Sequence, residues 1–267
     1  MIDAAVTRLL PRAFLPPIWR ELRALERWLL PSDGAAAPVA PLGTARPVML
    51  IPGFLAADSS LGYAASYLRA AGYEPYGSDL RWNVDCSEAA VARLVARAEG
   101  LAERAGGRIV LVGHSRGGLF ARVLARRRPE LVSLVVTLAA PHRDPLAIHP
   151  LLWANAATLA TIGTLGVPGV MRWGCRVARC CEPFWRDLAA PFPRGVGLLS
   201  VYSRTDGVVD WRACVDPGGR CLETPASHCG MVAHQPTLWS VAQAIEELGE
   251  GARRRSAVEP SVVAQAA

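Results

Sequence analysis

The chain has 267 residues, of which 51% are hydrophobic, and it carries a formal net charge of +6. This length suits one α/β domain and the apolar content supports a large core, so composition excludes a chain that is disordered throughout. Every basic residue is arginine. Because a compositional bias of the genome explains that as well as an anionic ligand does, we expect no nucleic-acid partner.

The first 46 residues precede the main domain. Residues 18–30 combine tryptophan and leucine with charged residues at helical spacing, and residues 31–46 are rich in Pro, Ala and Gly. We therefore expect an amphipathic helix and a linker over residues 1–46. This helix packs on the domain or, as the alternative, contacts a membrane surface. These residues lack the basic region, the uninterrupted apolar region and the small-residue cleavage site that follow one another in a secretory signal. We therefore expect a cytoplasmic protein without a signal peptide.

Strands and helices alternate from residue 47 onward. Short apolar runs indicate strands at 48–51, 73–78, 109–112, 131–138, 196–202 and about 221–223. Helical spacing indicates helices at 59–71 and 119–128. A further helix is predicted to begin at the helix-opening box of Asp85 and Glu88 and to end at Gly106. The alternation predicts the α/β class, with a mostly parallel sheet, helices on both faces and ligand sites at the carboxyl ends of the strands.

No charged residue occurs between Pro145 and Met171, a length that would cross a membrane. We reject a spanning helix because strands 131–138 and 196–202 on either side must pair in one sheet, and because glycines and a proline interrupt the segment. We predict instead an apolar helical cap at about 143–192. It is inserted in a domain of residues 47–250, and a polar, disordered tail follows at 251–267.

The chain contains seven cysteines, an odd number in a chain too long to need disulfide staples. None has the paired two-residue spacing of a zinc site, so we expect no metal. Cys214 and Cys221 flank the turn-like stretch 216–219. Either the two cysteines face each other across a hairpin and form a disulfide, or both are buried thiols.

Gly113-His114-Ser115-Arg116-Gly117 matches the nucleophile elbow G-x-S-x-G, and it follows a predicted strand and precedes a predicted helix. The turn is so tight that small residues must flank the serine, which pushes the Ser115 hydroxyl to where a base can reach it. Acyl transfer also requires two backbone N–H groups aimed at the developing oxyanion. Arg116 follows the nucleophile, and Phe54 lies in the loop after the first core strand, so these are the candidate donors.

The order Ser, acid, His requires a late histidine as base and an acid after strand 196–202. His228 follows the last predicted strand and is the candidate base, with His234 as the alternative. Asp206 lies in a polar turn and is the candidate acid, which would hold the imidazole in the productive tautomer. Asp210 is the second choice of acid, and Asp144 is the third.

These motifs resemble bacterial α/β-hydrolase lipases and esterases of the triacylglycerol-lipase and membrane-ester-deacylase type. The resemblance covers about residues 47–248 and rests on 48–54, 113–118, 137–142, 202–209 and 227–230. It implies the α/β-hydrolase fold, the triad Ser115, Asp206 and His228, and oxyanion roles for Phe54 and Arg116. Pro52-Gly53 stands where many relatives have His-Gly, and Ala139-Ala140 stands where they have Gly-Ser or Gly-Thr.

The sequence thus predicts a serine hydrolase of carboxylic esters that needs neither metal nor organic cofactor. The apolar cap favours a small-molecule or lipid ester with a hydrophobic acyl chain, and Leu55, His114 and Trp153 are candidate substrate-binding residues. An acyltransferase or thioesterase with the same triad remains open, as does a non-catalytic binding protein on this fold. The sequence does not indicate an oligomeric state.

Overall fold

The computed structural model describes residues 17–21, 42, 45–176 and 180–258. Of the N-terminal helix expected at 18–30, residues 18–21 are described, and 19–21 are helical. The rest of that helix and most of the linker lie outside the described residues, as does the end of the tail from 259.

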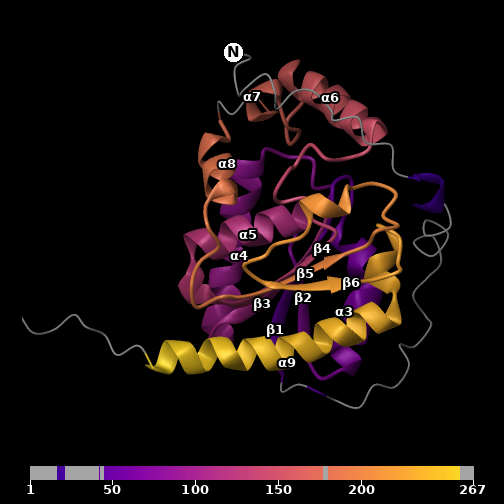
Figure 1. Ribbon diagram of the computed structural model, residues 1–267. Helices are drawn as coiled ribbons and strands as arrows, with labels where there is room; N and C mark the ends of the chain where they lie inside the picture. The colour runs from indigo at the N-terminus through magenta and orange to yellow at the C-terminus, as the bar shows by residue number, and fades with distance from the viewer. Residues whose placement is uncertain (1–16, 22–41, 43–44, 177–179, 259–267) are drawn as a thin grey trace, which may run out of the picture.

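Six parallel strands form one sheet in the order β2-β1-β3-β4-β5-β6 (Figure 1). The strands are β1 Pro47–Ile51, β2 Glu74–Gly77, β3 Ile109–His114, β4 Val132–Leu138, β5 Gly197–Tyr202 and β6 Arg220–Glu223. The strands β1, β3 and β4 are buried along their whole length, which explains why apolar residues predominate in them. The strand order reverses between β1 and β3, so the loops leaving these two neighbours open the crevice where such folds bind ligands.

Helices cover both faces of the sheet (Figure 1). On one face lie α3 (Gly62–Ala70) and α9 (Gln235–Val258), and on the other lie α4 (Ser87–Ala105), α5 (Arg116–Arg127) and α8 (Glu182–Ala189). Alternate residues of β1 serve the two cores: Val48 and Leu50 pack with α3 and α9, whereas Met49 and Ile51 pack with α4 and α5. The predicted α/β class with helices on both faces is therefore confirmed.

The predicted cap segment contains α6 (Pro150–Thr164) and α7 (Trp173–Arg176), which lie together at one end of the molecule (Figure 1). Because α6 ends at Thr164 and a turn follows, the uncharged run does not form one continuous helix. Across the part of the chain that the structure describes, no helix combines the length and the apolar character of a membrane span. Met171 N donates to Val84 O at 2.8 Å, which ties this segment to the loop before α4.

Three local expectations differ from the structure. The N-cap of α4 is Cys86, not Asp85, and Asp85 Oδ1 accepts a hydrogen bond from Cys86 N at 2.6 Å. No hairpin joins Cys214 and Cys221, because β6 pairs in parallel with β5 and both cysteines are free thiols. The helix α9 continues to Val258, so the tail expected from residue 251 begins as helix.

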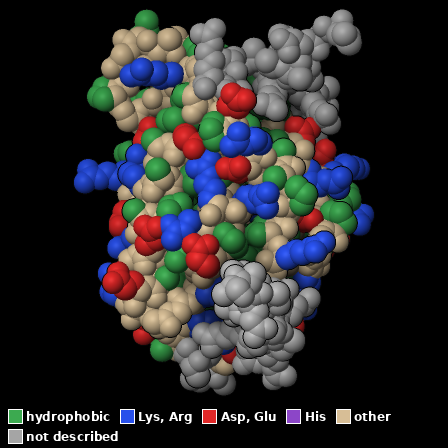
Figure 2. Space-filling model, turned by 90° about the vertical axis from the view of Figure 1, so that its left-hand side faces the viewer, with side chains coloured by type: hydrophobic (Ala, Val, Ile, Leu, Met, Phe, Trp, Pro, Cys, Tyr) green, Lys and Arg blue, Asp and Glu red, His purple; other side chains and the backbone are tan. Residues whose placement is uncertain are grey.

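Arginine and acidic side chains are interspersed on the face shown in Figure 2. Among the helices α4, α5 and α8, Arg127 is paired with Glu88 at 2.9 Å and with Asp187 at 2.7 Å. One guanidinium thus joins three helices and holds α8 against α4 and α5, which cover one face of the sheet.

Candidate active site

Ser115 lies at the turn between β3 and α5 with φ 52° and ψ −120°. This backbone conformation is unusual for a residue other than glycine and costs about 1–3 kcal/mol. Neighbouring contacts hold it in place, since Ser115 N donates to Leu138 O at 2.8 Å and Gly118 N donates to Ser115 O at 3.0 Å. The strained turn places Ser115 on the wall of the cavity described below.

The elbow glycines are required by close backbone contacts. A Cβ atom at Gly117 would lie 2.2 Å from Ile51 O, and one at Gly113 would lie 2.5 Å from Gly117 O. A Cβ atom at Gly118 would lie 2.5 Å from the Ala140 Cβ. The start of α5 therefore packs directly on the end of β1, which brings Ser115 beside the loop after β1.

His228 and Asp206 are in direct contact, because His228 Nδ1 lies 2.9 Å from Asp206 Oδ2. Both side chains are buried. The other carboxylate oxygen, Oδ1, accepts hydrogen bonds of 2.7 Å from the amides of Val208 and Val209. These bonds fix the carboxylate toward the imidazole.

Burial alone would lower the pKa of His228, but the charge and hydrogen bond of Asp206, together with the charge of Glu21, raise that pKa above 6.5. The alternative residues have other contacts. Asp210 caps the short 3-10 helix Trp211–Ala213 by accepting from Arg212 N, and His234 Nδ1 lies 2.8 Å from Thr237 Oγ1.

His114 joins the elbow to the histidine loop. Its Nε2 lies 3.0 Å from the His228 carbonyl oxygen, and the two imidazole rings are 4.8 Å apart. Burial, followed by the charge of His228, lowers the pKa of His114 to about 3, so this imidazole stays neutral. The residue before Ser115 thus contacts the candidate base directly, which brings the two loops side by side.

Glu21 is a buried carboxylate that was not among the residues predicted for the site. Its Oε1 accepts hydrogen bonds from Gly207 N at 2.9 Å and His228 N at 3.0 Å, and its Oε2 accepts one from Cys229 N at 2.8 Å. One side chain from the N-terminal segment thus holds both the loop of Asp206 and the loop of His228. The sequence carries no signal for this, because a glutamate among arginines on an amphipathic helix has the appearance of a solvated residue.

The amides of Phe54 and Arg116 both lie in segments that border the cavity. Within the described ranges, neither amide donates a hydrogen bond to another protein group. Arg116 is the first residue of α5, where backbone N–H groups have no partner within the helix. Two backbone donors without a protein partner among the described residues therefore belong to residues that line the same cavity as Ser115.

A cavity of about 1340 Å³ lies over the carboxyl ends of the strands. Its walls combine core residues with the cap segment and include Phe54, Ser115, Arg116, Leu152, Ala156 and Phe192. Of the three predicted substrate-binding residues, none is among the residues that line it. Leu55 is 44% exposed, His114 lies against the His228 loop, and Trp153 packs with Arg176, whose guanidinium lies 5.5 Å from the indole centroid.

The cavity also has a charged wall that no pattern in the sequence indicates. Arg122 is 7% exposed and pairs with Asp216 at 2.8 Å, and His142 Nε2 lies 3.5 Å from the same carboxylate. Burial and then the charge of Arg122 lower the pKa of His142 to about 4. The wall therefore carries a buried ion pair, and the Arg122 guanidinium lies 5.0 Å from the centroid of the Phe192 ring.

Comparisons with known proteins show what the chain is similar to in sequence and in fold. The family model of the PGAP1-like alpha/beta domain matches residues 76–152, a stretch that includes the elbow. A GPI inositol-deacylase of Candida albicans is 30% identical over 103 residues, which are 38% of this chain and 17% of that protein. The chain thus spans less than a fifth of the length of this curated relative.

Two solved structures are similar over most of the domain. A mature lipase of Bacillus licheniformis has a TM-score of 0.55 and 17% identity, with 79% of this chain and 96% of that chain covered. A metagenome-derived lipolytic enzyme also has a TM-score of 0.55, with 16% identity and coverage of 82% and 98%. The likeness concerns the arrangement of the whole domain.

Proposed function

The chain has the α/β-hydrolase fold, and on that premise we propose that it is a serine hydrolase that cleaves carboxylic esters through an acyl-enzyme on Ser115. The observation that carries the proposal is the 2.9 Å contact between His228 and the fixed carboxylate of Asp206, on a loop that abuts the strained elbow. A base, an acid that orients it and a hydroxyl on the wall of a cavity are the parts that nucleophilic acyl transfer requires.

In the proposed reaction, His228 takes the Ser115 proton at Nε2 while Nδ1–H donates to Asp206. The serine oxygen bonds to the ester carbonyl carbon, and the carbonyl oxygen becomes an anion that accepts from the Phe54 and Arg116 amides. The tetrahedral intermediate collapses, the imidazolium gives its proton to the leaving alkoxide, and the alcohol departs. A water molecule deprotonated by His228 then hydrolyses the acyl-enzyme by the same steps and releases the acid.

The cavity supports an ester with an apolar acyl part and a polar alcohol part. Leu152 and Ala156 from α6 supply an apolar wall, whereas Arg122 and Asp216 supply a buried ion pair. The deacylase name of the Candida albicans relative and the lipase names of the solved structures support a lipid ester as substrate. Such a substrate would place its acyl chain toward the cap and its polar part near Arg122.

The test is hydrolysis of p-nitrophenyl esters of increasing chain length. We expect turnover by the unaltered chain and a loss of about 1,000-fold or more in kcat for Ser115→Ala. Ser240→Ala is the matched control, because Ser240 lies on α9 and its hydroxyl donates to Pro236 O. Equal activity of the two variants, or no turnover of any ester by the folded protein, would remove the proposal.

An acyltransferase with the same triad is the second candidate, since the acyl-enzyme is common to both reactions. A graded series of acceptor alcohols added to the ester assay separates the two. Faster release of p-nitrophenol, together with a new ester product at the expense of free acid, would favour transfer over hydrolysis. A binding protein without catalysis predicts no p-nitrophenol release at any acceptor concentration.

A further inference from the structure

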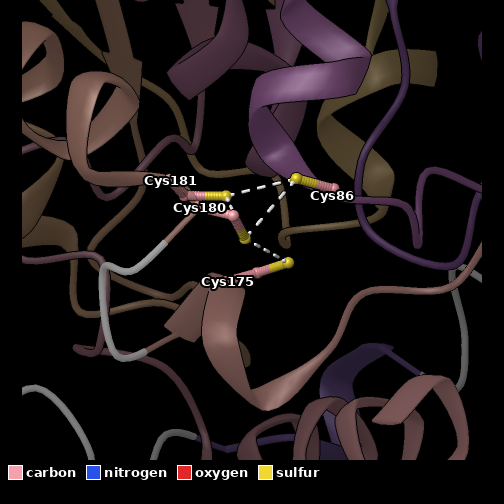
Figure 3. Close-up of side chains that lie close together, drawn as sticks. All are labelled: Cys86, Cys175, Cys180 and Cys181. Atoms are coloured by element: carbon pink, nitrogen blue, oxygen red, sulfur yellow. Dashed lines mark hydrogen bonds between the residues drawn. The ribbon is translucent and has the colours of Figure 1, made fainter.

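Four of the seven cysteines meet in one cluster beside the cavity (Figure 3). Cys86 caps the N-terminus of α4, Cys175 belongs to α7, and Cys180 and Cys181 directly precede α8. Their four sulfur atoms all lie within 4.8 Å of one another. Core and cap segments some 90 residues apart in the chain therefore turn their thiols toward one point.

The sulfur separations match the edges of a coordination tetrahedron. The Sγ atoms of Cys86 and Cys181 are 3.4 Å apart, those of Cys180 and Cys181 3.8 Å, and those of Cys86 and Cys180 4.0 Å. Cys175 Sγ lies 3.2 Å from Cys180 Sγ. A tetrahedral zinc with Zn–S bonds of about 2.3 Å requires about 3.8 Å between neighbouring sulfurs. The thiols need only small adjustments to reach that geometry.

We propose that Cys86, Cys175, Cys180 and Cys181 bind one Zn²⁺ ion, which fastens the cap to the core of the domain. Soft thiolate ligands in a tetrahedral set select zinc among the common divalent cations. Four protein ligands leave no open position for water, so the ion is structural and not catalytic. On binding, the four thiols release their protons to solvent and the Zn²⁺ ion accepts a lone pair from each sulfur.

The surroundings suit the negative charge of such a complex. Arg172 N donates to Cys175 Sγ at 3.4 Å, and the Cys86 sulfur sits at the N-terminus of α4, where the helix dipole favours negative charge. The guanidinium of Arg116 donates to the carbonyl of Asp85, the residue before Cys86, so a cation lies beside the turn that carries this sulfur. Both a dipole and a cation thus face the cluster.

The same contacts connect the cluster to the candidate active site. The Arg116 side chain donates to the carbonyl of Asp85 at 2.7 Å and to Ser87 Oγ at 3.1 Å, so it holds the turn that carries Cys86. Cys175 and Ser87 both line the cavity. A zinc ion here would fix the wall between α4 and α7 and would add to the Met171–Val84 hydrogen bond that ties the cap segment to the core.

Metal content tests the site without any assay of activity, so its outcome is independent of the proposed function. The full chain is produced in zinc-supplemented medium, desalted and analysed by inductively coupled plasma mass spectrometry. We expect about one zinc per chain, falling at least about tenfold in Cys175→Ser and Cys181→Ser. Cys221→Ser is the matched control, because Cys221 is an exposed thiol outside the cluster, and it should keep the metal.

Cobalt substitution covers the case in which a cysteine variant fails to fold. The unaltered chain, stripped of metal and titrated with Co²⁺, should gain the intense visible absorption of a tetrahedral tetrathiolate, with saturation at one ion per chain. A folded chain that holds no metal overturns the proposal, as does metal retained by both variants. The intact mass is also measured under non-reducing conditions. A mass that is lower by two hydrogens for each disulfide would show that the four cysteines form disulfides and would overturn the zinc site.

Discussion

At the residue scale, the candidate site depends on a chain of buried polar contacts. Asp206 is fixed by two amides and contacts His228, and Glu21 accepts hydrogen bonds from the backbones of both loops. Two carboxylates near one imidazole favour its charged form. That is the form that the proposed base acquires when Ser115 attacks, so the same electrostatics that raise the His228 pKa would stabilise the transition state.

The pH dependence of the esterase reaction follows from the raised pKa of His228. A general base must be neutral, so kcat/KM should fall as pH decreases through that pKa, with the midpoint of the acid limb above 6.5.

Asp206→Asn should lower kcat by about 10,000-fold, because an amide does not hold the productive tautomer. A pH profile of p-nitrophenyl ester hydrolysis measures both. A flat profile between pH 5 and pH 8 would contradict the role of His228.

Glu21→Gln should move the acid limb to lower pH, because it removes a charge that raises the His228 pKa. An amide also cannot accept from all three amides that the carboxylate holds, so kcat should fall as the loops loosen. Glu103→Gln, an exposed residue of α4, removes the same charge far from His228 and should leave the profile unchanged. A purely structural role for Glu21 predicts lower thermal stability with no shift of the limb.

At the element scale, the elbow is a steric device made from three packed elements. The glycines at 113, 117 and 118 let β1, β3 and α5 approach to backbone contact, and the approach sets the position of Ser115. These glycines and all six strands could be predicted from the sequence. A buried parallel strand appears there as a short apolar run, and the turn appears as the local motif G-x-S-x-G. The α4 cap was misplaced because Asp85 bonds the adjacent amide and Cys86 takes the capping position.

Gly117→Ala tests the packing of the elbow. The added Cβ would lie 2.2 Å from Ile51 O, so backbone must shift, and we expect a loss of about 1–3 kcal/mol in the free energy of unfolding, together with lost activity. Gly100→Ala is the matched control in the middle of α4, where the Cβ meets nothing within 4 Å. It should stabilise the protein by about 0.5–1 kcal/mol. Urea denaturation measures both, and equal effects would contradict the packing argument.

At the scale of the whole molecule, the cap and the core share one cavity, and distant segments complete the site. Sequence patterns predicted the cap and the candidates Ser115, Asp206 and His228, because each follows a strand whose end faces the crevice. They did not predict Glu21, Arg122 or the cysteine cluster. Those residues meet only through tertiary packing: Cys86 and Cys175 share no local motif, so spacing in the sequence gave no metal signal.

The cavity should limit the length of the acyl chain that the protein accepts. Ala156 is buried on α6 and lines the cavity, so Ala156→Trp should fill part of it and shift the preferred p-nitrophenyl ester to shorter chains. Leu165→Trp places the same indole at the 82% exposed residue that caps the end of α6 and should leave the preference unchanged. A preference that is the same in both variants would place the acyl chain elsewhere.

The central claim is that the Ser115 hydroxyl is a nucleophile activated by His228. Labelling of the folded chain with a fluorophosphonate probe, followed by peptide mapping, tests it most directly. We predict one covalent adduct on Ser115, absent in Ser115→Ala and formed far more slowly in His228→Ala. A folded chain that takes no label, or one labelled equally well without Ser115, would contradict the claim.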